Sequence, residues 1–197
     1  LGSALTENYS LQELELGMQN FGPKGFKALS ESLKRNTGLR KLNLWDNAGG
    51  EEGAKYFADS LSVNAHLAYI ELGDNSIGPQ GAIVLADMLT KNKALSEFRA
   101  WSNNIGDSGA VALARAVQTN PSLKVLAVGN NHIGDSGAVA LANMLKHNAV
   151  LVKLELNSGE IGPLGAKVLA AALEENVTLE TLSLRFNKLG GEGIKLL

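Results

Sequence analysis

The 197-residue chain contains no cysteine, which excludes disulfide bonds and every metal site built on thiolates. Because disulfides are characteristic of secreted proteins, their absence favours a cytoplasmic location. The formal net charge is only −2, so the chain lacks the basic balance typical of proteins that bind nucleic acid. No apolar run approaches the ~18 residues that a membrane-spanning helix needs. Neither a nucleic acid nor a membrane is therefore predicted as a partner.

The chain has instead one pattern that recurs at a constant interval. Leu-x-x-Leu-x-Leu begins at Leu11, Leu39, Leu67, Leu95, Leu123, Leu151 and Leu179, and each start lies 28 residues after the last. A fixed internal period of this size is typical of solenoids, in which each unit buries its apolar face against its neighbours. The sequence predicts one domain of seven stacked units over residues 1–197.

Each unit predicts a short strand followed by a helix. In the copy at 123–150, Leu126 and Val128 alternate with more polar or smaller neighbours, which indicates a strand with one buried face. Leu141, Ala142 and Leu145 fall on one stripe of a helix that we expect over about 138–146. Adjacent strands lie ~4.8 Å apart, whereas adjacent helices need ~8–10 Å. The stack must bend, so we predict an α/β horseshoe with a parallel sheet on the concave face and helices on the convex face.

Polar residues and glycines recur at fixed places in the unit. An asparagine after the strand is expected to bond unpaired loop backbone and to form a ladder, interrupted where Gln19 and Gly159 stand in its place. A second asparagine is expected to end each helix in the left-handed conformation. The first glycine of each Gly-x-x-Gly pair suits a turn that few other residues tolerate. Asp107 and Asp135, which lie between the glycines, are predicted to cap their own helices.

The complete unit, Leu-x-x-Leu-x-Leu-x-x-Asn-x-Ile-Gly-x-x-Gly-Ala-x-x-Leu-Ala-x-x-Leu-x-x-Asn, resembles the ribonuclease-inhibitor-type leucine-rich repeat. It is most similar to the repeats of the NOD-like receptor family. The resemblance implies a ligand-sensing or scaffolding region without cofactors. Leu1, Leu5 and Asn8 match the end of a helix, and Leu197 matches Leu141, so we expect a fragment truncated at both ends.

The predicted binding surface is the concave wall, where side chains differ from copy to copy. Trp45 and Trp101, the two tryptophans of the chain, occupy the same outward position two copies apart, which predicts a separation of ~10 Å. Gly73 lies between them and is expected to leave a gap for a partner side chain. Tryptophan, tyrosine and arginine are enriched in interface hot spots. The predicted partner-binding residues are Lys41, Asn43, Trp45, Asp46, Tyr69, Glu71, Asp74, Glu97, Arg99 and Trp101.

Two features of this wall leave alternatives open. In a self-contained cluster, Arg99 would stack on Trp101 and pair with Glu71 instead of serving a partner. Acidic residues also outnumber basic ones on the wall, which favours a basic or mixed-charge protein partner, and a merely solvated face is the alternative. The oligomeric state does not follow from either observation.

The sequence predicts neither a catalytic nor a metal site, so the chain is not expected to be an enzyme. His132 and Glu160 share a loop position in adjacent copies and can pair, but two ligands do not make a zinc site. Two alternative functions remain. One is a GTPase-activating protein of the Ran type, which uses similar repeats. The other is a structural subunit of a large assembly such as a ciliary complex, with convex contacts through Lys55, Tyr56, Arg115 and Lys167.

Overall fold

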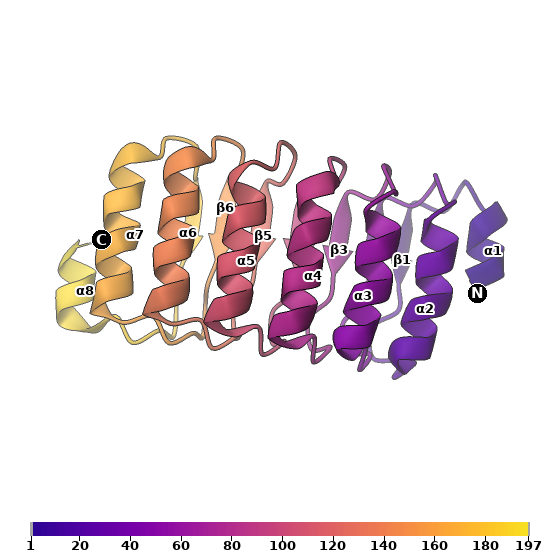
Figure 1. Cartoon of the computed structure of the whole chain (residues 1–197), viewed down its shortest axis with the longest axis horizontal. Helices are drawn as coiled ribbons and strands as arrows, with labels where there is room; N and C mark the ends of the chain where they lie inside the picture. Colours follow the sequence, from indigo (N-terminus) through magenta and orange to yellow (C-terminus); the bar gives the residue numbers. More distant parts are fainter. Residues whose placement is uncertain (1, 197) are drawn as a thin grey trace.

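The computed structural model describes residues 2–196 and shows a curved solenoid in which one β-α unit follows the next (Figure 1). Over those residues, a parallel sheet runs in chain order from β1 to β7, with each copy shifted by one period, so that Leu42 pairs with Leu14 and Ile70. The strands are β1 Glu13–Glu15, β2 Lys41–Asn43, β3 Tyr69–Glu71, β4 Glu97–Arg99, β5 Val125–Ala127, β6 Lys153–Glu155 and β7 Thr181–Ser183. The predicted α/β leucine-rich repeat solenoid is confirmed.

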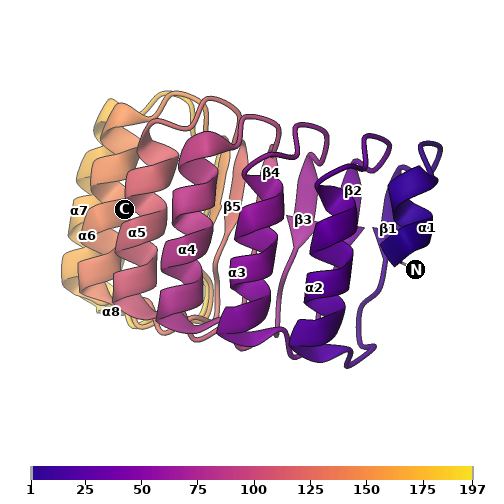
Figure 2. The same ribbon diagram turned by 45° about the vertical axis from the view of Figure 1, so that its right-hand side comes forward.

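The helices form one layer on the convex side, and the strands form the other layer (Figures 1 and 2). They are α1 Gly2–Glu7, α2 Gly22–Leu33, α3 Gly50–Leu61, α4 Gly78–Lys91, α5 Gly106–Gln118, α6 Asp135–His147, α7 Pro163–Glu175 and α8 Gly190–Leu196. Leu5 on α1 is buried, as expected for the end of a repeat helix, whereas Leu1 and Leu197 lie outside the described residues. Within residues 2–196, no helix is both long and apolar enough to cross a bilayer.

The core lies between the two layers and repeats in every copy. Leu123, Leu126 and Val128 are at most 1% exposed, and they meet Leu141 and Leu145 of α6 in one continuous cluster. Burying a leucine or valine side chain contributes about 1.5–3 kcal/mol. Since successive copies share this cluster, the stack fixes the direction of every outward side chain on the sheet.

The asparagine ladder after the strands forms as predicted. The Asn75 amide donates to Leu44 O of the preceding copy at 2.9 Å and to Leu72 O at 3.0 Å, and its Oδ1 accepts from Asn47 N at 3.1 Å. Asn103 N donates in turn to Asn131 Oδ1 at 2.7 Å. Gly159 has no side-chain amide to continue the ladder. In that copy, Glu160 N donates to Ile133 O at 2.7 Å. The break in the sixth copy was thus predicted.

A second asparagine ladder lies at the helix ends, and there the predicted conformation is wrong. Asn92, Asn148 and Asn176 are extended, with ψ near 125–128°, rather than left-handed. The Asn148 amide reaches back to Val117 O at 2.7 Å, and its Oδ1 accepts from Leu151 N at 2.7 Å. The residue is placed there because its side chain satisfies buried backbone groups of two copies, not because it tolerates a strained φ.

The aspartates near the helix starts cap the neighbouring copy, not their own. Asp107 Oδ1 accepts from Gly134 N at 2.8 Å and from Gly137 N at 2.9 Å, at the start of α6. Asp135 Oδ1 likewise accepts from Gly162 N, just before α7, at 2.7 Å and from Gly165 N, in the first turn of α7, at 2.8 Å. The predicted caps of α5 and α6 by their own aspartates are therefore wrong, because the carboxylate lies closer to the next helix in the stack.

Candidate protein-binding surface

The predicted partner-binding residues lie on one wall of the solenoid. In the sheet register, Lys41, Tyr69 and Glu97 form one row across β2, β3 and β4, and Asn43, Glu71 and Arg99 form the next. Trp45 and Trp101 extend the wall just beyond β2 and β4, with Asp46 and Asp74 following on its rim. Since backbone hydrogen bonds tie these strands together, the wall presents its side chains from a rigid base.

The two tryptophans stack on each other over Gly73. Their ring centroids are 5.9 Å apart and the planes differ by 26°. A Cβ atom at Gly73 would lie 2.6 Å from both Nε1 and Cε2 of Trp101, so only glycine fits beneath the ring. The expected gap for a partner side chain is closed. The ~10 Å estimate applies to the strand positions, whereas the rings lean toward each other across the bare strand.

Carboxylates hold the stacked rings in place. The Trp45 indole Nε1 donates to Asp74 Oδ2 at 3.1 Å. Glu71 accepts from Gly73 N at 2.8 Å and from the Trp101 side chain, although only 8% of Glu71 is exposed. Burial raises the pKa of the Glu71 carboxyl, and the hydrogen bonds from Gly73 and Trp101 oppose that shift. The stack is therefore a built structure with polar anchors on both rings.

Arg99 does not make the contacts that a self-contained cluster with Glu71 and Trp101 would require. Its guanidinium lies 3.3 Å from Glu97 and 3.6 Å from Glu155, and it sits over the Tyr69 ring at 5.8 Å from the centroid. The alternative in which Arg99 pairs with Glu71 and stacks on Trp101 is wrong, because Arg99 contacts Glu97, Glu155 and Tyr69 instead. Arg99 therefore does not cover Trp101. Burial, followed by the nearby Glu71 charge, raises the pKa of Tyr69.

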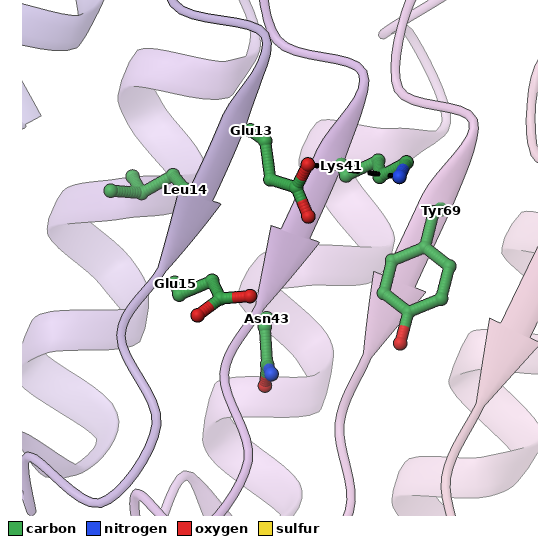
Figure 3. A pocket seen from close by; sticks show the side chains of 6 residues that line it. All are labelled: Glu13, Leu14, Glu15, Lys41, Asn43 and Tyr69. Atoms are coloured by element: carbon green, nitrogen blue, oxygen red, sulfur yellow. Dashed lines mark ion pairs between the residues drawn. The ribbon is translucent and has the colours of Figure 1, made fainter.

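A hollow opens on the same wall at the amino-terminal side of the stack (Figure 3). It is lined by Glu13, Leu14, Glu15, Lys41, Asn43 and Tyr69. Lys41 Nζ is 3.7 Å from Glu13, whereas Glu15 points toward Asn43 (Figure 3). The predicted site did not include Glu13 and Glu15. Their positions one 28-residue period before Lys41 and Asn43 could have identified them as part of the same wall.

The loop edge carries a pair that matches its prediction. His132 Nδ1 is 3.3 Å from Glu160, and Lys188 Nζ is 3.4 Å from the same carboxyl. The hydrogen bond from His132, followed by the charge of Lys188, lowers the pKa of Glu160. Across residues 2–196, no group of three histidine, cysteine or acidic side chains is arranged to hold a metal ion.

Comparison with known families agrees with this architecture. The family model described as Leucine Rich repeat matches residues 63–86, 102–114, 119–142, 147–170 and 175–197, which is more than half of the chain. The chain belongs to the leucine-rich repeat family. No protein of curated function matches it at a significant level.

Two solved structures share the fold. One is described as leiomodin-1 actin-binding site 2, with a TM-score of 0.52 and 18% identity over 88% of this chain and 87% of that chain. The other is a tropomodulin C-terminal domain from Caenorhabditis elegans, with a TM-score of 0.62 and 13% identity over 76% of this chain and 92% of that chain. At these identities the comparison shows a shared fold alone.

Proposed function

We propose that this leucine-rich repeat chain is a protein-interaction module that binds its partner through the concave wall around β2, β3 and β4. The observation that carries the proposal is the Trp45–Trp101 stack. Both indoles are half-buried and anchored by Asp74 and Glu71. An aromatic pair fixed on a rigid sheet loses little conformational freedom when a partner covers it, which favours affinity.

The charges of the wall support a basic or mixed-charge partner. Glu13 and Glu15 are exposed beside the stack, as is Asp46 on the rim. Arg99 is already engaged by Glu97 and Glu155, so it offers little positive charge to a partner. Complementary charge across an interface speeds association and excludes like-charged competitors.

We further propose binding in place of catalysis. The titratable side chains at the centre of the wall already have partners. Arg99 pairs with two carboxylates, and Glu71 accepts a hydrogen bond from the Trp101 side chain. The role that fits best is the ligand-sensing or scaffolding region of a NOD-like-receptor-like protein. Because the leiomodin-1 structure is described as an actin-binding site, actin is the first defined protein to test.

Removal of the tryptophans tests the proposal. Trp45→Ala and Trp101→Ala are each expected to weaken partner binding by roughly 2 kcal/mol, the loss typical of hot-spot residues. Because the rings touch, the double variant is expected to lose less than the sum of the two. The measurement is capture of partners from cell extract, and co-sedimentation with actin, by the wild type and each variant.

Tyr56→Ala is the matched control, because this half-buried tyrosine lies on α3 of the convex layer. It is expected to leave partner binding unchanged. A partner that binds the tryptophan variants normally but is lost with Tyr56→Ala would place the interface on the helices and contradict the proposal. Circular dichroism of each variant separates lost binding from lost structure.

A further inference from the structure

One repeat position just beyond each strand shows an alternation of small and large residues. Through successive copies it reads Gly17, Trp45, Gly73, Trp101, Gly129, Asn157 and Arg185. Each tryptophan is thus flanked on both sides by strands that carry glycine. A bare strand between neighbours with side chains forms a slot about one ring wide, since strands lie ~4.8 Å apart.

The slot over Gly73 shows what such a space accepts. It is occupied by the Trp101 ring, whose Nε1 and Cε2 take the place that a Cβ at residue 73 would need. The ring thus comes from the copy that follows the glycine. By the same arrangement, the side chain of residue 157 would cover Gly129.

Asn157 leaves that second slot open. Its Oδ1 accepts from Ser183 Oγ at 2.7 Å and from Arg185 N at 3.0 Å, so the side chain is turned toward the seventh copy and away from Gly129. The result is a hollow on the carboxyl-terminal side of Trp101, lined by Trp101, Ala127, Gly129, Asn130, Glu155, Asn157 and Ser158. Gly129 gives the floor of the hollow no side chain, and a Cβ there would not fit, since it would lie 2.8 Å from Asn157 O and 3.5 Å from Asn157 Cβ.

The lining of this hollow favours a neutral ring. Ala127 stands at the position that Glu71 holds beside the Gly73 slot, so no buried carboxylate lies next to the floor. Glu155 is neutralised by Lys153 at 2.5 Å and Arg99 at 3.6 Å. A cationic guest would meet those two cations, whereas an aromatic guest meets the half-buried Trp101 ring, and aromatic pairs attract beyond the area they bury.

We propose that the slot over Gly129 receives one aromatic side chain of the protein partner, which packs against Trp101 in the way that Trp101 fills the slot over Gly73. This inference rests on the proposed function, because it assigns the partner a residue that reaches the concave wall. It extends the binding surface from β4 to β6, beyond the residues that the sequence predicted.

The test uses N-acetyl-L-tryptophanamide as the probe and two-dimensional amide NMR of the whole chain. The expected result is saturable shift changes at the amides of Gly129, Asn130 and Ser158 and at the Trp101 indole N–H. Asn157→Trp fills the slot from within and is expected to weaken probe binding at least about tenfold, a difference of 1.4 kcal/mol. Asn157→Ala removes the same two hydrogen bonds but leaves the slot open, so it is expected to bind the probe like the wild type.

Three results would overturn the inference. They are shift changes that map away from the slot, equal probe binding by Asn157→Trp and the wild type, or tighter binding of N-acetyl-L-argininamide than of the tryptophan probe. If Asn157→Trp does not fold, Trp101→Ala removes the wall of the slot and must abolish probe binding. Because the probe needs no partner, its failure alongside partner loss in the Trp45→Ala variant would reject the slot and leave the concave-wall proposal standing.

Discussion

At the scale of single residues, Glu71 has the least ordinary environment on the concave wall. Its carboxyl is buried beneath the tryptophan pair, where loss of solvation raises its pKa above the ordinary value of 4.5. The hydrogen bonds from Gly73 and Trp101 recover part of that loss. Glu71 therefore ties the geometry of the stack to the stability of the fold.

This burial predicts a definite pH dependence. A raised pKa means that the folded chain binds the Glu71 proton more tightly than the unfolded chain does, so the folded state is favoured by protonation. The free energy of unfolding of the wild type, relative to Glu71→Gln, is expected to fall as pH rises from 4.5 through the raised pKa. It should then stay level. Urea denaturation of both proteins between pH 4 and 8 measures this difference.

The matched control is Glu97→Gln, because Glu97 is less buried and lies on the next strand. The Glu97 variant is not expected to reproduce the same slope against pH. A wild type that gains stability over Glu71→Gln as pH rises would mean that the hydrogen bonds outweigh burial.

At this scale the sequence predicted positions better than contacts. It placed Trp45, Glu71 and Trp101 together on the wall, because the 28-residue period fixes the strand of each. It could not show that the rings lean over Gly73, since side-chain rotamers depend on what the neighbouring strand leaves empty. Nor could it show that Arg99 contacts Tyr69, Glu97 and Glu155, because several partners lie within its reach.

At the scale of the elements, the turn before each helix takes two forms. The first glycine has a positive φ of 59–68° at Gly22, Gly50, Gly78, Gly106 and Gly190, but φ is −106° at Gly134 and −98° at Gly162. Those two glycines are the ones whose N–H groups bond an aspartate of the preceding copy. The carboxylate pulls the turn into an extended shape that any residue adopts.

Two alanine substitutions separate the two turns. Gly106→Ala is expected to lower the free energy of unfolding by about 1 kcal/mol, because an L-residue resists the left-handed region. A Cβ there meets nothing within 4 Å, so the loss comes from the backbone alone. Gly134→Ala is expected to change stability by less than about 0.5 kcal/mol, since φ is negative there and the nearest atom to the new Cβ is 3.6 Å away.

Urea denaturation at neutral pH compares the two variants with the wild type. Equal losses would mean that the Asp107 bond does not set the shape of the turn. The sequence could not distinguish these glycines, because they occupy the same repeat position and the difference lies in the copy before. It therefore placed Asp107 at the right end of the helix layer but assigned it to the wrong helix.

At the scale of the whole molecule, burial is deepest in the middle of the stack. Leu126 on β5 is 0% exposed and pairs in register with Phe98 and Leu154 on its two sides. Leu182 on β7 occupies the same repeat position and is only partly buried. In a solenoid, each copy contacts only its neighbours, so stability depends on how many neighbours a copy has.

The same substitution at these two positions measures that difference. Leu126→Ala is expected to cost about 3 kcal/mol of unfolding free energy, which is typical of a leucine removed from a packed core. Leu182→Ala is expected to cost about 1 kcal/mol, because less apolar area leaves the water there. Chemical denaturation gives the values, and amide hydrogen exchange should show slower exchange on β5 than on β7. Equal costs would contradict a stack held by nearest neighbours.

The overall architecture was predictable because the same leucine pattern recurs seven times from Leu11 to Leu179. If one copy were misinterpreted, the other six would still indicate the correct unit. The binding surface was less predictable, since recognition depends on side chains that differ between copies. The hollow beside Trp101 is an example. It exists because the Asn157 side chain bonds the seventh copy. The residue type does not determine whether an asparagine bonds the copy before it or the copy after it.

The equal length of every copy has a further consequence for how such a surface changes over generations. Because the strand register advances by one period per copy, unequal recombination between any two copies yields a chain that still pairs throughout. Such an event between adjacent copies adds or removes the wall side chains of one strand. The recognition surface can therefore lengthen or shorten by whole copies in single steps, while the selection for folding acts on a unit that stays the same.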